Sequence, residues 1–399
     1  MKKSVQKKKQ PKRVNRSRKP RGFLKAPIQI KVIGVGGGGG NAISRMSKDF
    51  SRGVDLVAVN TDIQDLEHCQ AKHKINIGRN LTKGMGAGMN PELGRQAAEE
   101  NRLDLTEMLE GSDLVFLTAG MGGGTGTGAT PVIADIAKEL GALTVAVVTK
   151  PFAFEGSQRI KIAEEGVLKL KDKVDALIII PNDRIFEVIG SDTSILKAFL
   201  KIDEVLKNTV LGITEIISSA GLVNVDFADV RTIMENTGLA LIGVGQAAGK
   251  DRAIKAAEQA INSPLLEFSI EGAKGVLFAV AGGRDLKMIE INEAAKLVTE
   301  NIDPGARIIF GAYLDNKLKS GQIKITLIAA GFNGFLKDRE PFTLFPSLKT
   351  NELPSKKGEE KEEATNQKIK TKKEDVAGRP TVKEDSILEI PAFLRRRKR

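Results

Sequence analysis

The chain has 399 residues, 41% of them hydrophobic, which allows two or three domains with sizeable cores. Aromatic residues make up only 4%, with no Trp and one Tyr, and this argues against a stacking platform for single-stranded nucleic acid. The single cysteine, Cys69, excludes an intramolecular disulfide and fits a reducing compartment.

The net charge of +12 is concentrated at the ends of the chain. Residues 1–25 carry twelve Lys or Arg and no acid, and residues 395–399 carry five more basic side chains, which leaves 45 basic against 50 acidic residues elsewhere. We predict that residues 1–26 form a disordered basic arm. Such an arm could contact nucleic acid, an anionic membrane surface or an acidic partner.

Two local features have simple explanations. The uncharged stretch 114–134 is long enough for a membrane span, but its glycines and Pro131 split it into two short apolar halves. His68, Cys69 and His73 lie close in sequence, but a zinc site would need a fourth ligand and none has the spacing, so an incidental cluster is expected. The basic N-terminus has no apolar segment and is not expected to be a secretory signal.

The first half of the chain alternates strands with helices. Apolar runs predict strands at 28–35, 56–59, 114–118, 144–148 and 176–180, and helices are predicted at 41–49, 91–109, 131–140 and up to about 171. Because these strands are continuous apolar runs, they indicate a parallel sheet covered on both faces. We therefore predict a Rossmann-like α/β domain over residues 27–192.

Three glycine-rich loops punctuate this domain, at 36–40, 83–91 and 119–130. Glycine lets the backbone approach a ligand closely, and a strand, a glycine loop and a helix start together point backbone N–H groups at phosphate. Ligands of parallel sheets bind beyond the carboxyl ends of the strands, so the three loops are candidates for one site. A merely tight turn is the weaker interpretation.

The type of phosphate ligand is indicated by the number of loops. Residues 34–39 fit the dinucleotide pattern G-x-G-x-x-G, but five consecutive glycines satisfy many patterns, and three loops suit a triphosphate better. No phosphate-binding G-x-x-x-x-G-K-[ST] motif occurs, so we expect loop amides, a helix dipole and a metal such as Mg²⁺ to neutralise the phosphates.

The second half of the chain begins with a long helix. Apolar residues at a spacing of three to four over 193–217 predict a helix of about 37 Å, which can connect two domains. We assign 193–220 to this central helix and 221–334 to an α+β activation domain. Strands are expected there at 239–246, 275–281, 307–314 and 322–330, and helices at 251–262 and 287–301.

Asn224, Asp226 and Asp229 lie at the predicted start of a further helix. Capping is the simpler role for any one of these aspartates. Carboxylates can also orient and polarise a water that attacks a phosphate. Two carboxylates would repel a triphosphate bound beside them, so they make more sense facing a phosphate held by another molecule.

The end of the chain changes composition twice. Residues 346–385 hold ten basic and nine acidic side chains with little apolar content, and we predict a disordered linker over 335–384. Residues 385–399 combine an apolar cluster with a basic end, which is typical of a docking peptide.

Together these motifs resemble the tubulin/FtsZ GTPase family. The resemblance covers about 28–334, and the terminal I-P-A-F-L-R-R matches the C-terminal peptide of FtsZ, whereas the basic arm is not part of the family pattern. The matching segments, in order, are V-G-G-G-G-G-N-A at 35–42, N-T-D at 60–62, 84–88, G-G-G-T-G-T-G at 122–128, 151–156, P-N-D at 181–183 and N-V-D-F-A-D-V at 224–230.

The resemblance implies a GTPase that polymerises head to tail into the bacterial division ring, in the cytoplasm on the inner face of the membrane. Membrane-anchoring and regulatory division proteins would bind 385–399, and GTP would be the substrate, with Mg²⁺. Phosphates would contact Gly37, Gly38, Gly39, Gly40, Asn41, Gly124, Thr125 and Gly126; Glu155 and Arg159 would contact the ribose and phosphates, and Asp203 the guanine. Asn224, Asp226 and Asp229 would complete the site of the adjacent subunit.

Two points stay open. Glu204, beside Asp203, departs from the Asn or Asp often found there in the family, so the base contacts are less fixed than the phosphate contacts. A different class of function is a nucleotide-binding scaffold whose basic ends bind DNA or membrane, and a dinucleotide oxidoreductase is a distant third.

Overall fold

The computed structural model describes residues 28–332, apart from 49, 51–52, 191, 219–220, 264–269 and 316–317. The predicted arm (1–26), the linker (335–384) and the docking peptide (385–399) lie outside the described residues. Within the described part, no helix combines the length and apolarity that a membrane crossing needs.

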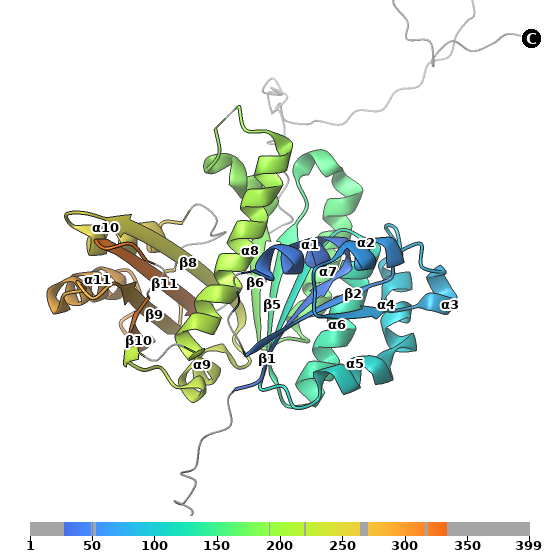
Figure 1. Cartoon of the computed structure of the whole chain (residues 1–399), viewed down its shortest axis with the longest axis horizontal. Helices are drawn as coiled ribbons and strands as arrows, with labels where there is room; N and C mark the ends of the chain where they lie inside the picture. Colours follow the sequence, from blue (N-terminus) through green and yellow to red (C-terminus); the bar gives the residue numbers. More distant parts are fainter. Residues whose placement is uncertain are drawn as a thin grey trace, which may run out of the picture. The chain divides into compact units, whose positions relative to one another are not determined.

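The first half of the chain forms a parallel α/β layer structure, as the apolar runs predicted (Figure 1). Six strands pair in the order β3-β2-β1-β4-β5-β6, all parallel. They span β1 Ile30–Val35, β2 Val54–Asn60, β3 His73–Asn76, β4 Leu114–Gly120, β5 Leu143–Lys150 and β6 Ala176–Pro181. Alternate residues of each strand pack into two cores, one under α1 (Gly36–Met46) and α8 (Ile195–Ser218) and the other under the helices from α4 (Pro91–Glu100) to α7 (Ser157–Lys171).

The helices of this half are α1 Gly36–Met46, α2 Ile63–His68, α3 Arg79–Thr82, α4 Pro91–Glu100, α5 Arg102–Leu109, α6 Gly124–Glu139 and α7 Ser157–Lys171, with short 3₁₀ turns η1 Ala153–Glu155 and η2 Asn182–Glu187. The prediction of one helix over 91–109 was wrong, because Asn101 leaves helical geometry between α4 and α5. Its side chain accepts a hydrogen bond from Gly78 N (2.9 Å) and donates one to Asp104 (2.8 Å), which replaces helix continuation.

The glycine runs at 36–40 and 124–128 form the first turns of α1 and α6 and are not loops, contrary to the sequence prediction. Close packing accounts for this. A Cβ on Gly39 would lie 2.4 Å from the carbonyl oxygen of Thr118, and one on Gly128 would lie 1.9 Å from that of Pro91. These glycines let α1 approach β4 and let α6 approach α4, which outweighs the low helix propensity of glycine.

The long helix predicted over 193–217 is confirmed as α8 Ile195–Ser218. It is followed by β7 Gly221–Val223 and α9 Phe227–Met234, and then by β8 Gly238–Ala248, α10 Arg252–Ile261, β9 Gly275–Gly282, α11 Met288–Glu300, β10 Arg307–Leu314 and β11 Gln322–Ala330. The four predicted strands and two predicted helices of the second body are all present. The three-residue β7, which pairs with β10, was not predicted.

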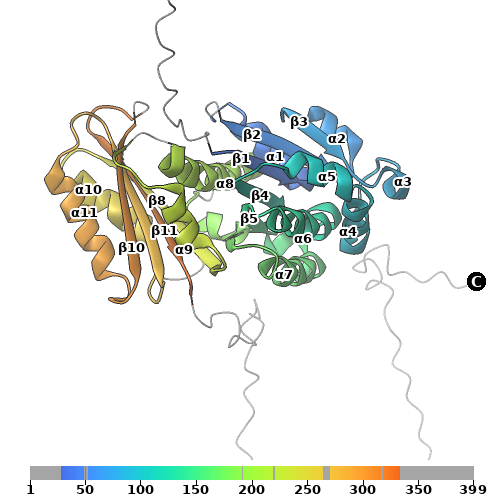
Figure 2. The ribbon, with the colours of Figure 1, turned by 90° about the horizontal axis from the view of Figure 1, so that it is seen from below.

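The two halves share one sheet order. β8 pairs in parallel with β6 through two residue pairs, which extends the order to β8-β11-β9-β10-β7. Figures 1 and 2 place α10 and α11 on the face of the C-terminal sheet away from α8. α8 and α9 cover the other face, so α8 contributes to the core of both halves.

A buried ionic network ties the C-terminal helices together. Arg252, at the start of α10, has a side chain that is only 6% exposed and donates to Glu290 Oε1 (2.7 Å) and Oε2 (2.9 Å) on α11. It also donates to the carboxylate of Asp285 (2.6 Å), which in turn accepts from Gly321 N (3.1 Å). The hydrogen bonds from Arg252 lower the pKa of the Glu290 carboxyl below its ordinary value of 4.5.

We expect Arg252→Met to lower the free energy of unfolding by about 3 kcal/mol at pH 7, because removing one partner of a buried ion pair leaves the carboxylates unpaired. Since the pKa of Glu290 is lowered in the folded state, the stabilisation is complete above the ordinary pKa of 4.5 and is lost as the pH falls through the lowered value. Urea unfolding at several pH values should therefore show the difference between wild type and variant shrinking in acid. Lys255→Ala, on the exposed face of the same helix, is the control and should stay within about 0.5 kcal/mol of wild type. A difference that does not depend on pH would contradict the role of the network.

Candidate functional site

A cavity of about 680 Å³ lies at the carboxyl ends of the parallel strands. This is within the roughly 300–1,000 Å³ typical of small-molecule sites and at the edge where parallel sheets bind ligands. Its walls come from the β1–α1 and β4–α6 junctions, the turn 85–88, the segments after β2, β5 and β6, and the first turns of α8. The loops that the sequence analysis assigned to one site therefore do meet.

Two helix N-termini face this cavity without caps. The residues before α1 and α6 are Val35 and Gly123, and neither makes a side-chain capping bond. A Cβ on Gly36, whose φ is +72°, would lie 3.0 Å from Gly126 N, so the two helix starts are in close contact. First-turn N–H groups, which have no partner within their own helix, and the positive ends of two helix dipoles thus converge, which is an arrangement for an anion with several phosphate groups.

The third glycine-rich segment supports the start of α6. Gly88 O accepts a bond from Gly124 N (2.6 Å), which holds the turn 84–88 against the helix. The hydroxyls of Thr61 and Thr125 are 2.6 Å apart and link the end of β2 to the same helix. Asp62 caps α2 by accepting from Gln64 N and Asp65 N, so its carboxylate is partly engaged.

The opposite wall carries polar and aromatic side chains. The carboxylate of Glu155 accepts a hydrogen bond from Phe152 N (2.9 Å) and forms an ion pair with Arg159 in the first turn of α7. Asp203 on α8 pairs with Arg45 on α1, and the Asp203 side chain is only 13% exposed. The Phe199 ring packs edge-on against Phe152, with the ring centres 5.4 Å apart. This wall can recognise a flat polar ring and a sugar.

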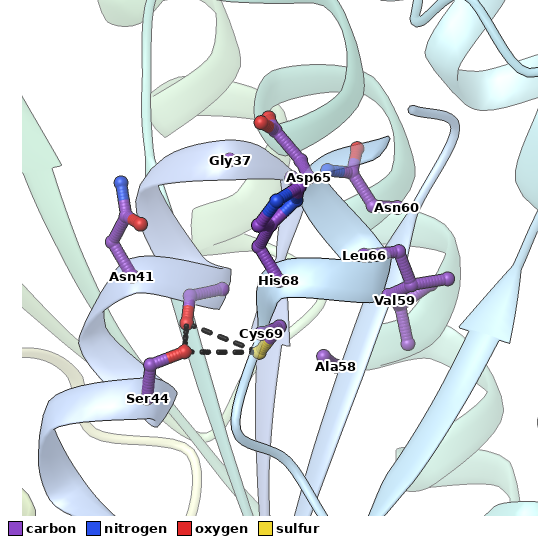
Figure 3. Close-up of a pocket in the computed structure, with 12 residues that line it drawn as sticks. Gly37, Asn41, Ser44, Ala58, Val59, Asn60, Asp65, Leu66, His68 and Cys69 are labelled. Carbon is purple, nitrogen blue, oxygen red and sulfur yellow. Dashed lines mark hydrogen bonds between the residues drawn. The ribbon is translucent and has the colours of Figure 1, made fainter. Parts of the chain in front are cut away.

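Nine of the predicted contact residues line the cavity: Gly37, Gly38, Asn41, Gly124, Thr125, Gly126, Glu155, Arg159 and Asp203. Gly39 and Gly40 do not. Gly39 packs against β4, and Gly40 faces a small alcove of about 80 Å³ between α1 and α2 (Figure 3). The role of each lining residue in ligand binding stays a prediction.

Figure 3 shows that alcove, with Cys69 and Ser44 at its base. The Gly40 carbonyl accepts from Ser44 Oγ (2.9 Å) and Cys69 Sγ (3.3 Å). His68 Nδ1 is bonded to the carbonyl of Gln64 (2.7 Å). Among the described residues, no group of three or more His, Cys, Asp or Glu side chains could hold a metal ion.

The three predicted hydrolytic residues lie elsewhere. Asn224, Asp226 and Asp229 follow β7, beyond the far end of α8, and none of them lines the cavity. Asp226 is exposed, Asp229 is half-buried with its carboxylate accepting from Asp226 N (3.1 Å), and Asn224 accepts from Gly221 N (2.6 Å). The cavity is lined by α8 as far as Leu206, and the second half of this helix, about 18 Å at 1.5 Å per residue, separates the cavity from the group (Figure 1).

Several cavity residues were not predicted as contacts, among them Arg45, Phe199 and Asn182, although Asn182 belongs to the P-N-D segment that resembles the family. Arg45 lies four residues after Asn41 and Phe199 four before Asp203, so helical spacing could have indicated both. Asn182 directly follows β6, at the edge where ligands bind. It is 7% exposed, and its Oδ1 is buried with no hydrogen-bond partner among the described residues. A buried acceptor without a partner in a cavity wall is suited to a ligand hydroxyl.

Comparison with known proteins gives two family matches. Residues 29–190 match the model described as the Tubulin/FtsZ family, GTPase domain, and residues 238–333 match that of the FtsZ family, C-terminal domain. An empty FtsZ dimer from M. jannaschii is 45% identical, with 77% of this chain and 89% of that chain covered and a TM-score of 0.73. A tryptophan-to-tyrosine mutant of FtsZ from M. jannaschii is 46% identical, with 76% and 91% covered and a TM-score of 0.72.

A more distant match shares the fold alone. The CetZ2 protofilament from Haloferax volcanii is 22% identical to this chain, with 76% of this chain and 92% of that chain covered and a TM-score of 0.66.

Asn182→Ala tests the cavity wall directly. Removing the unpartnered acceptor should raise the Kd for a nucleoside triphosphate about 3- to 10-fold, which corresponds to one hydrogen bond of about 0.5–1.5 kcal/mol. Equilibrium binding of a fluorescent triphosphate measures it. Asn301→Ala, the same exchange at the end of α11, is the control. Equal affinities of the wild type and both variants would remove Asn182 from the site.

Proposed function

This chain belongs to the tubulin/FtsZ family and is a GTPase, and we propose that it polymerises head to tail into filaments of the cell-division ring, with hydrolysis completed by the adjacent subunit. The observation that carries the proposal is the separation of the phosphate cavity from the Asn224–Asp229 group by the second half of α8. One chain holds both halves of a hydrolytic site but cannot bring them together.

The proposed pose of GTP follows the chemistry of the walls. The phosphates lie against the N-termini of α1 and α6, where N–H groups are free of caps. Glu155, Arg159 and Asn182 are placed to contact the ribose. The Asp203 carboxylate can accept the two adjacent N–H donors of guanine, and the Phe199 ring offers a stacking face. Arg45 holds Asp203 in the structure, so the base must compete for that carboxylate.

Mg²⁺ fits this site as a companion of the nucleotide. The ion keeps several waters and takes only one or two carboxylates besides phosphate oxygens. The cavity offers Asp62 and Asp65, and no described cluster of three or more acidic, His or Cys side chains suits a dedicated metal site. The ion would neutralise phosphate charge. We propose that it enters bound to GTP.

Exposed apolar side chains at both ends of α8 support a head-to-tail contact. Near the cavity, Phe154, Phe186 and Leu196 are each more than half exposed, and the two phenylalanine rings pack against the buried ring of Phe152. Beyond the C-terminal end of α8, Leu222 is 65% exposed and lies two residues before Asn224. A heterologous contact between these two surfaces buries both, and because they differ, the chain of subunits stays open.

In such a junction the carboxylates face the terminal phosphate of the neighbour. We propose that the Asp229 carboxylate, which the Asp226 N–H orients, accepts a hydrogen bond from the attacking water. The exposed side chain of Asp226 can contact this water or a cation beside it. The uncapped N-termini of α1 and α6 stabilise charge on the phosphates as the bond to the leaving group breaks. Asn224 fixes the turn through Gly221 and supports this geometry.

The cellular setting is part of the proposal. A division ring in the cytoplasm, on the inner face of the membrane, follows from the family resemblance, as does docking of anchoring and regulatory proteins to residues 385–399. Placement in a bacterial cell has the same basis.

Assembly dependence makes a kinetic prediction. GTP turnover per molecule should rise with protein concentration above a threshold, since only subunits with a neighbour hold a complete site. Phosphate release measured from sub-micromolar to tens of micromolar protein, with sedimentation in parallel, tests this. Turnover per molecule that is constant over this range would contradict the shared site.

Asp229→Asn should keep GTP affinity within about 2-fold and lower turnover by at least about 100-fold, the scale of a lost general base. The amide can still accept the Asp226 N–H, so the turn is preserved. Glu235→Gln, at the other end of α9, is the matched control and should hydrolyse GTP normally. If Asp229→Asn instead abolishes binding, the residue belongs to its own subunit's cavity.

A further inference from the structure

The basic arm, residues 1–26, begins from a fixed place in the fold. Its root is the start of β1, where Gln29 exchanges hydrogen bonds with Asp113: Gln29 N donates to the Asp113 carboxylate (2.8 Å) and Asp113 N donates to Gln29 O (2.9 Å). The first described residue, Ile28, packs against the core under α8. The arm therefore leaves the body at the amino ends of the parallel strands.

This edge also carries the Asn224–Asp229 group. The Asp113 carbonyl accepts from Leu143 N (3.0 Å) at the start of β5, and the Gly141 carbonyl accepts from Arg231 Nη2 (2.9 Å) on α9. A short series of hydrogen bonds thus runs from the root of the arm to the helix that Asp226 and Asp229 begin. Figure 1 shows the start of β1 and α9 at the same end of α8, away from α1.

A head-to-tail junction at this edge brings negatively charged groups of two subunits close together. The cavity of one subunit is lined by four carboxylates, of Asp62, Asp65, Glu155 and Asp203, against the two guanidinium groups of Arg45 and Arg159. Bound phosphates add more negative charge. The approaching subunit contributes Asp226 and Asp229, which like charge would push away unless cations neutralise the interface.

Arg231, two residues after Asp229 on α9, is already engaged. Arg231 donates to Gly141, and its guanidinium lies over the Phe227 ring, 5.6 Å from the ring centre. The arm, by contrast, brings twelve Lys or Arg and no acid to the same edge. A segment as long as the arm has a root-mean-square reach of about 28 Å as a random coil and spans about 85 Å at most when fully extended.

We propose that the basic arm binds the nucleotide end of the next copy of this chain and neutralises the carboxylates and phosphates at the junction. The inference rests on the proposed head-to-tail filament. Its partner is a second copy, and not a membrane or a nucleic acid, because the root lies at the edge that faces the neighbour and the surface opposite is acidic. The arm then acts as a salt-sensitive clamp on assembly.

The test compares the full chain with two variants, one lacking residues 2–25 and one with the twelve basic residues of 1–25 replaced by glutamine. The critical concentration for sedimentation with GTP and Mg²⁺ is measured at about 50 and 300 mM salt, which brackets the range over which screening becomes strong. We expect both variants to raise the critical concentration at least about 5-fold at low salt, and this difference from the full chain should shrink at high salt, since screening weakens both the attraction of the arm and the repulsion that it offsets. Replacing the five basic residues of 395–399 by glutamine is the matched control and should leave it unchanged.

A photocrosslinker distinguishes binding to a neighbour from binding within one chain. With p-benzoylphenylalanine in place of Asn15, irradiation of filaments should give crosslinked dimers that map to residues 181–203, and none with GDP. Crosslinks confined to one chain would overturn the proposal, as would an unchanged critical concentration. Loss limited to binding of phosphatidylglycerol vesicles or duplex DNA would overturn it in favour of those partners. If the full chain does not sediment with GTP, the filament proposal fails first, and the role of the arm fails with it.

Discussion

The length of α8 is the constraint on which the rest of this account depends. The cavity is lined by α8 only as far as Leu206, and the Asn224–Asp229 group lies beyond Ser218, so about 18 Å of helix, at 1.5 Å per residue, lies between them. α8 packs into the cores of both halves, so it cannot shorten or bend to bring them together. In the proposed mechanism, hydrolysis depends on a second copy of the chain, and GTP turnover then reports on assembly.

The cavity itself depends on how closely two helices approach one sheet edge. Gly39 and Gly128 remove the side chains that would keep α1 from β4 and α6 from α4. With the helices so placed, their N-termini, which no side chain caps, meet at the proposed phosphate site, whose described lining residues include no lysine. The same glycines that the sequence predicted as phosphate-binding loops act as packing contacts, and in the proposed site the positive ends of two helices take the place of a charged side chain.

Much of the fold could be predicted, because apolar runs and helical spacing are local signals. Five of the six parallel strands, α8 and the strands β8 to β11 follow from them, whereas the four-residue β3 was not predicted. The glycine runs were misjudged, since glycine has low helix propensity and only packing against Thr118 and Pro91 makes them helical. The break at Asn101 depends on a bond to Gly78, and β7 is too short to leave a pattern. The Arg45–Asp203 pair joins residues far apart in the chain, which one sequence cannot reveal.

The shared site is tested most directly by mixing two inactive proteins. Asp229→Asn keeps its cavity but loses its carboxylate, and Asp203→Ala keeps its carboxylates but should lose GTP. Each should be inactive alone, whereas an equimolar mixture should recover about a quarter of wild-type turnover, because about that share of random junctions joins an intact cavity to intact carboxylates. A mixture that stays as inactive as its components would contradict a site built from two subunits.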